Sequence, residues 1–234
     1  MTTNPFPLPP DLPRPVDDGA CRHLVGMRSP HTRLPSTAGR LVDLGALPPG
    51  RTVIYCYPMT GAPGVALPDD WDLIPGARGC TPQACGFRDH AGELAELGAA
   101  VFGLSTQSTE YQREMAERLH LPFEVLSDAG SEFTNALRLP TFEVEGRRLI
   151  KRLTVVIRDG AIEHVFCLSA GRERGGRRAM AARAAARLTP HRSRVEGASQ
   201  RPRAGLLQHR GERLGAHLHR AREWMIDRDD DQQP

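Results

Sequence analysis

The sequence contains no apolar run that approaches the roughly 18–20 residues needed to cross a bilayer. Its N-terminal stretch, MTTNPFPLPPDLPRPVDDG, also lacks the charged and then apolar regions of a signal peptide. The five cysteines are an odd number, which does not suit the paired disulfide framework of a small secreted protein. These absences argue against a membrane protein and a secreted disulfide scaffold, and we expect a cytoplasmic location.

The composition is that of a globular protein with an uneven charge. Of the 234 residues 39% are hydrophobic and 25% are charged, which is typical of a soluble domain. Residues 167–234 contain 15 Arg against 8 Asp and Glu, a net charge of +7. Because the whole chain carries +3, the preceding 166 residues carry −4. The character of the chain therefore changes near residue 167.

Three regions follow from this pattern. We expect residues 1–23 to be a Pro-rich, extended arm and residues 24–168 to be the folded domain. We expect residues 169–234 to be a basic tail that lacks a steady apolar face, apart from one Ala-rich helix over Arg177–Leu188. The tail has one Trp, an acidic end and no recognised nucleic-acid-binding motif, so a nucleic-acid partner is not expected.

Strands and helices are predicted to alternate along the folded region. Apolar, β-branched and aromatic runs predict strands at Leu41–Leu44, Arg51–Tyr57, Ala100–Leu104, Phe123–Leu126, Arg152–Ile157 and Ile162–Phe166. Apolar residues at helical spacing predict helices from Pro82 to Gly98 with Thr81 as N-cap, over Tyr111–Leu119, and over Ser131–Leu137. Asp159-Gly160 predicts a hairpin between the last two strands. This order predicts an α/β thioredoxin-like fold, with a central mixed sheet flanked by helices.

The chemistry of the chain is expected at Cys80 and Cys85. Cys80 lies at a predicted helix start, where free backbone N–H groups and the positive end of the helix dipole stabilise a thiolate. The pair taken alone is equally consistent with two small buried residues. Its Cys-x4-Cys spacing is not that of zinc knuckles, and no second Cys or His pair stands nearby to complete a tetrahedral site. We therefore expect no metal and no cofactor.

The flanking residues carry a resemblance to a known family. Gly79-Cys-Thr-Pro-Gln-Ala-Cys-Gly-Phe-Arg-Asp89 resembles the peroxiredoxins, and among them the PrxQ or bacterioferritin comigratory protein subgroup. The resemblance spans roughly residues 24–166. Its further matches are Val53-Ile-Tyr-Cys-Tyr-Pro58, Phe102-Gly-Leu-Ser-Thr106, Phe123-Glu-Val-Leu-Ser-Asp128, Arg152-Leu-Thr-Val-Val-Ile157 and Ile162-Glu-His-Val-Phe166.

The resemblance implies roles for four residues. Cys80 matches the peroxidatic cysteine and Cys85 the resolving cysteine. Arg152 matches the arginine that stabilises the thiolate and polarises the peroxide, and Gln83 matches a polar position that helps to orient that arginine. An ordinary surface charge at Arg152 and an unspecialised polar residue at Gln83 are the alternatives.

One part of the family pattern is displaced. Peroxiredoxins resembling this chain carry Pro-x3-Thr-x2-Cys, whereas here Ala77 stands three residues before Cys80 and Pro58 stands 22 residues before it. About 15 residues have thus been inserted. We expect Thr60, folded back with the inserted loop bulging outward, to supply the peroxide-binding hydroxyl, and Thr81 is a second candidate.

The implied reaction is the thiol-dependent reduction of hydroperoxides through a Cys80 sulfenic acid and a Cys80–Cys85 disulfide, reset by thioredoxin or a similar dithiol. Five helical residues place two Cα atoms about 9 Å apart, and a disulfide tolerates about 4.4–6.8 Å, so the first helical turns must unwind. A slow thiol redox sensor is the alternative function. Cys21, Cys56 and Cys167 are scattered, and we expect turnover without them.

Overall fold

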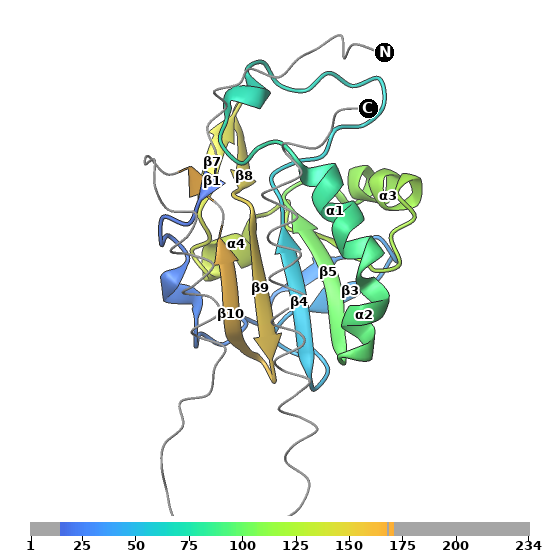
Figure 1. Ribbon diagram of the computed structural model, residues 1–234, viewed down its shortest axis with the longest axis vertical. Coiled ribbons are helices and arrows are strands. Elements are labelled where there is room, and N and C mark those ends of the chain that lie inside the picture. The colour runs from blue at the N-terminus through green and yellow to red at the C-terminus, as the bar shows by residue number, and fades with distance from the viewer. Residues whose placement is uncertain (1–14, 168, 171–234) are drawn as a thin grey trace, which may run out of the picture.

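The computed structural model describes residues 15–167 and 169–170, which are built around a central five-stranded sheet (Figure 1). The strands lie in the order β10-β9-β4-β5-β6. Their bounds are Arg51–Cys56 for β4, Ala99–Ser105 for β5, Val125–Ser127 for β6, Leu153–Arg158 for β9 and Ala161–Cys167 for β10. β4, β5 and β6 run parallel, whereas β9 is antiparallel to β4 and β10 is antiparallel to β9. The expected mixed sheet is confirmed.

Helices cover both faces of the sheet, as the apolar side chains on both faces of the central strand require. In β4, Val53 and Tyr55 pack into one core cluster, and Ile54 and Cys56 pack into the other. Because successive side chains of a strand point to opposite faces, a strand that is covered on both sides is apolar throughout. One cluster includes α1 (Cys80–Asp89), α2 (Ala91–Glu96) and α3 (Thr109–Arg118). The other includes η1 (Arg22–Leu24), β3 (Leu41–Asp43) and α4 (Glu132–Ala136).

The predicted helix from Pro82 to Gly98 is two helices. α1 begins at Cys80 rather than after Thr81, because Gly79 at φ +85° turns the chain into the helix. Thr81 is consequently inside the first turn and is not the N-cap. The helix breaks at His90, whose backbone at φ −105° and ψ 7° separates α1 from α2. None of the helices in the described ranges is long and apolar enough to cross a bilayer.

Two hairpins have the same turn. β9 and β10 are joined by Asp159 and Gly160, both at positive φ, as their Asp-Gly sequence predicts. β7 (Thr141–Val144) and β8 (Arg147–Ile150) are joined by Glu145 and Gly146, also both at positive φ. This second hairpin was not predicted from the sequence, because Glu is not typical of the first turn position.

The N-terminal boundary of the folded unit lies earlier than expected. Residues 15–23, assigned from the sequence to an extended arm, include β1 (Pro15–Val16), which pairs with β11 (Ser169–Ala170), and the start of η1. Cys21 is buried and disulfide-bonded to Cys167, so two of the cysteines that looked scattered in the sequence form a pair. Residues 1–14 and 171–234, with the predicted helix over Arg177–Leu188, lie outside the described residues.

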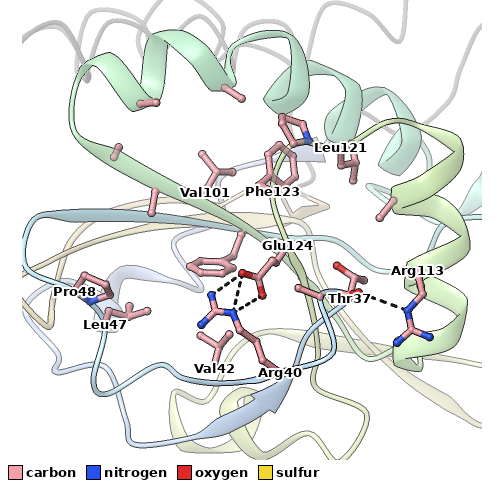
Figure 2. Close-up of a pocket in the computed structure, with 18 of the residues that line it drawn as sticks. Thr37, Arg40, Val42, Leu47, Pro48, Val101, Arg113, Leu121, Phe123 and Glu124 are labelled. Atoms are coloured by element: carbon pink, nitrogen blue, oxygen red, sulfur yellow. Dashed lines mark hydrogen bonds and ion pairs between the residues drawn. The ribbon is translucent and has the colours of Figure 1, made fainter.

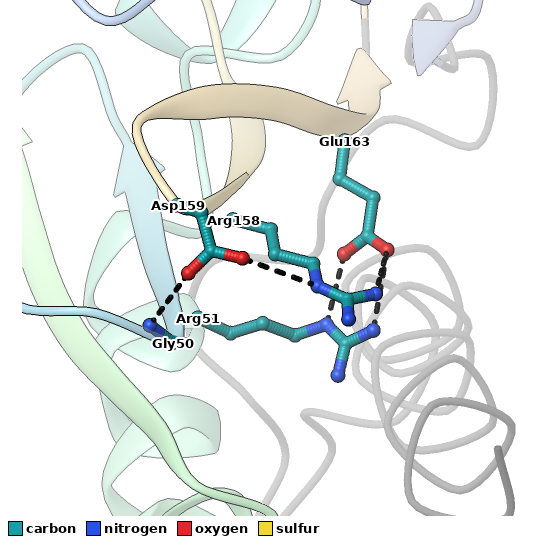
Figure 3. Close-up of polar contacts among 5 residues, drawn as sticks. All are labelled: Gly50, Arg51, Arg158, Asp159 and Glu163. Carbon is teal, nitrogen blue, oxygen red and sulfur yellow. Dashed lines mark hydrogen bonds and ion pairs between the residues drawn. The ribbon is translucent and has the colours of Figure 1, made fainter. Parts of the chain in front are cut away.

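An ion-pair network joins the amino-terminal end of β4 to the β9–β10 hairpin (Figure 3). Arg51 donates to the two carboxylate oxygens of Glu163, at 2.8 Å and 3.2 Å. Burial opposes the charged form of Glu163, but the hydrogen bond and charge of Arg51 outweigh it, so the pKa of this carboxyl lies below its ordinary value. Asp159 accepts from the backbone N–H of Gly50 at 3.1 Å and lies beside Arg158. The network fastens the end of the sheet at which β4 begins.

A substitution at Gly103 can test how tightly the sheet packs beneath α1. A Cβ built at Gly103 would lie 2.7 Å from the Tyr55 hydroxyl oxygen and 3.2 Å from Val125 Cγ1. Both neighbours are buried, so we expect Gly103→Ala to lower the free energy of unfolding by about 1–3 kcal/mol, measured by urea titration. Gly92→Ala is the matched control. Apart from its chain neighbours and the backbone of its own helix, no atom lies within 4 Å of a Cβ built at Gly92, so the same change in α2 should stabilise the protein by about 0.5–1 kcal/mol. Equal effects at the two positions would contradict this packing.

Candidate active site

Cys80 is the first residue of α1 and is only 4% exposed. It packs with Tyr55 and Tyr57 at the carboxyl end of β4. The Tyr55 ring in turn stacks on Phe87 of the same helix, with 4.5 Å between the ring centroids. This contact holds α1 on the sheet and so positions its N-terminus. Cys80 thus lies buried at a helix end, beside the backbone N–H groups that have no acceptor within the helix.

Arg152, the residue directly before β9, donates several hydrogen bonds to this end of the helix. Its Nη2 donates to Cys80 Sγ at 3.2 Å, and its side chain is 4% exposed. The same guanidinium donates to three backbone carbonyl oxygens, those of Gly76 at 3.4 Å, Arg78 at 2.5 Å and Gly79 at 3.2 Å. A buried guanidinium keeps its charge at any working pH, so the sulfur has a permanent positive neighbour.

Gln83 lies one helical turn beyond Cys80 and is 1% exposed. Its Oε1 accepts a hydrogen bond from Arg152 Nη1, which fixes one edge of the guanidinium while Nη2 faces the sulfur. The Gln83 Nε2 group is buried with no hydrogen-bond partner among the described residues. The structure therefore brings Cys80, Gln83 and Arg152 together.

The Cys80 thiol also has an acceptor on the inserted loop. Cys80 Sγ donates to the carbonyl oxygen of Ala77 at 3.4 Å. A thiol can make this bond and a thiolate cannot, whereas the bond from Arg152 is stronger to a thiolate. The sulfur therefore has a hydrogen-bond partner in each of its protonation states.

Cys85 lies on the same helix, five residues beyond Cys80, and is partly exposed. Both cysteines are free thiols in the intact helix. Two arginines, Arg88 and Arg118, lie close enough to Cys85 to interact with it electrostatically. The pKa of Arg88 is raised first by its hydrogen bond to Asp89 and then by Cys85. The pKa of Arg118 is raised chiefly by its hydrogen bond to Glu114, and Cys85 adds the smallest contribution. Positive charge therefore lies near the second sulfur as well.

Thr60, the expected peroxide-binding hydroxyl, is engaged elsewhere. Its backbone N–H and its hydroxyl both donate to Gln107 Oε1, at 3.0 Å and 3.3 Å, and Gln107 Nε2 donates back to the Thr60 carbonyl at 3.0 Å. Within the described part of the chain no hydrogen bond joins Thr60 to Cys80. Thr81, the second candidate, follows Cys80 in the first turn of α1 and is partly buried.

The inserted loop does not simply bulge outward. It contains η2 (Trp71–Leu73), and Trp71 is 4% exposed. Trp71 belongs to a small core cluster with Met59, Ala77, Val144 and Leu149, which links the loop to the β7–β8 hairpin. Since Ala77 carries the carbonyl that contacts Cys80, this cluster positions one hydrogen-bond acceptor of the sulfur. The sequence feature that could have indicated this packing is a single Trp within a Pro- and Gly-rich loop.

Cys56 is chemically distinct from the other free thiols. It is fully buried on the opposite face of β4, and burial, followed by the nearby Asp128 carboxylate, raises the pKa of its thiol. A buried neutral thiol is a poor nucleophile. Cys56 is therefore a packing residue.

A groove of about 1130 Å³ lies on another side of the molecule, lined by residues of α2, α3, β5 and the β2–β3 hairpin, in which β2 is Arg33–Pro35 (Figure 2). An ion pair between Arg40 and Glu124 crosses it, with 2.5 Å between nitrogen and oxygen. None of the five predicted site residues lines this groove. Although this groove is large, we therefore do not assign it as the active site.

The chain is similar to a known protein family and to several of its members. The family profile described as Redoxin matches residues 24–179, more than half of the chain. A Bcp-type peroxiredoxin of Coxiella burnetii is 32% identical over 104 residues, which cover 44% of this chain and 59%, less than two thirds, of that protein. Peroxiredoxin Bcp of Escherichia coli strain K12 is 32% identical over 146 residues, 61% of this chain and 84% of that protein. The solved structure of peroxidoxin BcpB from Mycobacterium tuberculosis has a TM-score of 0.50 at 28% identity, and covers 61% of this chain and 84% of that one.

The chain therefore belongs to the Redoxin family and, within it, to the peroxiredoxins of the Bcp or peroxiredoxin Q group. The resemblance seen in the sequence is confirmed, and so is the thioredoxin-like fold.

Proposed function

We propose that this protein reduces hydrogen peroxide and organic hydroperoxides with Cys80 as the nucleophile, Cys85 as the resolving thiol and Arg152 as the group that activates both sulfur and peroxide. The observation that carries the proposal is the 3.2 Å hydrogen bond from the buried Arg152 guanidinium to Cys80 Sγ at the start of α1. A permanent cation and a helix N-terminus aimed at one sulfur favour a thiolate there.

In the first step the Cys80 thiolate attacks one peroxide oxygen. An S–O bond forms with the sulfur electron pair, the O–O bond breaks, and the departing oxygen leaves with a proton as water or an alcohol. The Arg152 guanidinium donates to Cys80 Sγ, so its positive charge can stabilise the sulfur before the attack and the negative charge that develops on the departing oxygen. Gln83 acts as a positioning residue, because its Oε1 holds the other side of the guanidinium.

In the second step Cys85 attacks the Cys80 sulfenic acid, and water leaves as the disulfide forms. The intact helix places the two Cα atoms about 9 Å apart, beyond the range of about 4.4–6.8 Å in disulfides, so the start of α1 must unwind. Arg152 donates to both Gly79 and Gln83, and these bonds close the first turn of the helix against the sheet. They must therefore break as Cys80 moves toward Cys85.

Reduction of the Cys80–Cys85 disulfide completes the cycle. We propose thioredoxin or a similar dithiol as the reductant, in the cytoplasm, with no cofactor. Cys85 is the more exposed of the two sulfurs, which makes it the one that a partner thiolate reaches more readily.

Cys85→Ser tests the two-step cycle. The variant is expected to consume one equivalent of peroxide per chain, because Cys80 is intact, and then to stop, because the sulfenic acid has no resolving thiol. A sulfenic-acid trap such as dimedone, read by mass spectrometry, should label Cys80, while steady-state turnover with thioredoxin falls to background. Normal turnover by this variant would show that the reductant acts directly on Cys80.

A further inference from the structure

The described chain contains a second pair of cysteines, remote from Cys80. Cys21 and Cys167 are joined by a disulfide with 6.1 Å between their Cα atoms, although 146 residues separate them in sequence. Both are almost fully buried, at 3% and 2% exposure. They lie in the core cluster on the face of the sheet opposite to the one that holds Cys80. Direct exchange between this disulfide and Cys80 is therefore blocked by the sheet.

The segment that carries Cys21 runs along the edge of the sheet. β10 is the outermost strand on this side, and an uncovered outer strand presents unpaired backbone groups to other chains. Residues 26–29 cover it: Gly26 N–H donates to the Ile162 carbonyl at 2.9 Å, Ile162 N–H donates to the Met27 carbonyl at 2.9 Å, and Ser29 N–H donates to the Gly160 carbonyl at 3.0 Å. At the far end, β1 pairs with β11.

The disulfide lies between these two sets of backbone bonds. Cys21 precedes η1, and Cys167 is the last residue of β10. Cys21 also lies upstream of residues 24–179, the part of the chain that matches the Redoxin profile. The bond therefore ties a segment outside the matched family region to the last strand of the family fold.

We propose that Cys21 and Cys167 are a second redox pair, independent of Cys80 and Cys85, whose oxidation locks residues 15–29 over the β10 edge. Formation of the bond needs a two-electron oxidant, for which a disulfide of the glutathione class suffices. One protein thiolate attacks the oxidant disulfide and releases one thiol, giving a mixed disulfide. The second protein thiolate then displaces the other thiol and forms Cys21–Cys167. Two protein thiols are oxidised and one small disulfide is reduced to two thiols.

Because the two cysteine pairs differ in burial, their disulfides are expected to be reduced at different rates. A reductant reaches Cys21 or Cys167 only after residues 15–29 open from the sheet edge, whereas Cys85 is already partly exposed. The enzyme can therefore cycle at Cys80 and Cys85 while the lock stays closed. Because the lock spans 146 residues, it also restricts the unfolded chain and so stabilises the folded one.

The test uses the full chain with Cys56, Cys80 and Cys85 replaced by serine, which leaves only the two cysteines of the lock. This variant has no peroxidase thiols, so the outcome is independent of the proposed function. After oxidation by glutathione disulfide we expect one intramolecular Cys21–Cys167 bond by peptide mapping. We also expect slower amide hydrogen exchange in residues 15–29 and a melting temperature that is higher than that of the reduced form by roughly 5–15 °C. The matched control adds Cys21→Ser, and it should show none of these changes.

A second measurement uses the unaltered chain and does not depend on the folding of any variant. Oxidised protein is exposed to a limiting dithiol, and the released thiols are alkylated at intervals and mapped. Cys80 and Cys85 should be released at least about tenfold faster than Cys21 and Cys167, because only the latter need the edge segment to open. The proposal would be overturned if Cys21 and Cys167 were still free and open to alkylation after treatment with glutathione disulfide. It would also be overturned if the Cys21–Cys167 bond formed but changed neither the hydrogen exchange of residues 15–29 nor the melting temperature. Equal release rates for the two pairs would also overturn it.

Discussion

Cys80→Ser is expected to lower the rate of peroxide reduction by on the order of 10³-fold or more, because a neutral hydroxyl replaces the only sulfur that Arg152 contacts among the described residues. The measurement is peroxide consumption in the presence of thioredoxin and its reducing system, together with a single-turnover assay without reductant. Both signals should vanish, since no other described thiol combines a helix N-terminus with a buried cation.

The matched control is Cys56→Ser, which makes the same atomic change at a buried thiol on the other face of the sheet. It should keep the peroxidase rate near that of the unaltered protein, with circular dichroism used to show that the variant is folded. If Cys80→Ser turned over normally while Cys85→Ser did not, the nucleophile would be Cys85 and the assigned order of the two sulfurs would be wrong.

Arg152→Ala is expected to slow the first-turnover reaction with peroxide by about 10²–10³-fold, the range typical of removing one preorganised donor from a reacting centre. The variant loses both the positive charge beside the sulfur and the N–H donor that contacts it. Stopped-flow mixing with peroxide measures the attack, and the rate of Cys80 alkylation as a function of pH measures the thiolate directly. Both rates should fall together at neutral pH.

Two further variants separate chemistry from loop structure, since Arg152 also holds the carbonyls of Gly76, Arg78 and Gly79. Arg152→Lys keeps the charge but not the planar fork, so its rate should lie between those of the alanine variant and the unaltered protein. Added guanidinium at low concentration should partly rescue Arg152→Ala. Arg147→Ala, which removes an exposed arginine of the nearby β8 strand, is the control and should leave the rate unchanged. An alkylation profile for Arg152→Ala identical to that of the unaltered protein would exclude an electrostatic role.

Features that depend on residues close together in the chain could be predicted from the sequence. The period of apolar residues predicted the central strands, and Asp159-Gly160 predicted the final hairpin, because strand burial and turn conformation are set within a few residues. The placement of Cys80 and Cys85 at the start of a helix followed from the local pattern in the same way. The start of that helix was misplaced by two residues because Gly79, and not Thr81, turns the chain into it.

Contacts between residues far apart in the chain became visible in the folded structure alone. Arg152 reaches Cys80 across 72 residues of chain, and Cys21 reaches Cys167 across 146. Such contacts depend on strand order and on how the inserted loop packs through Trp71, neither of which leaves a periodic signal in the chain. For Arg152 a family resemblance supplied the missing information. For Cys21, which precedes the matched region, no local sequence feature could supply that information. Its bond to Cys167 forms because the N-terminal segment lies along the edge of β10.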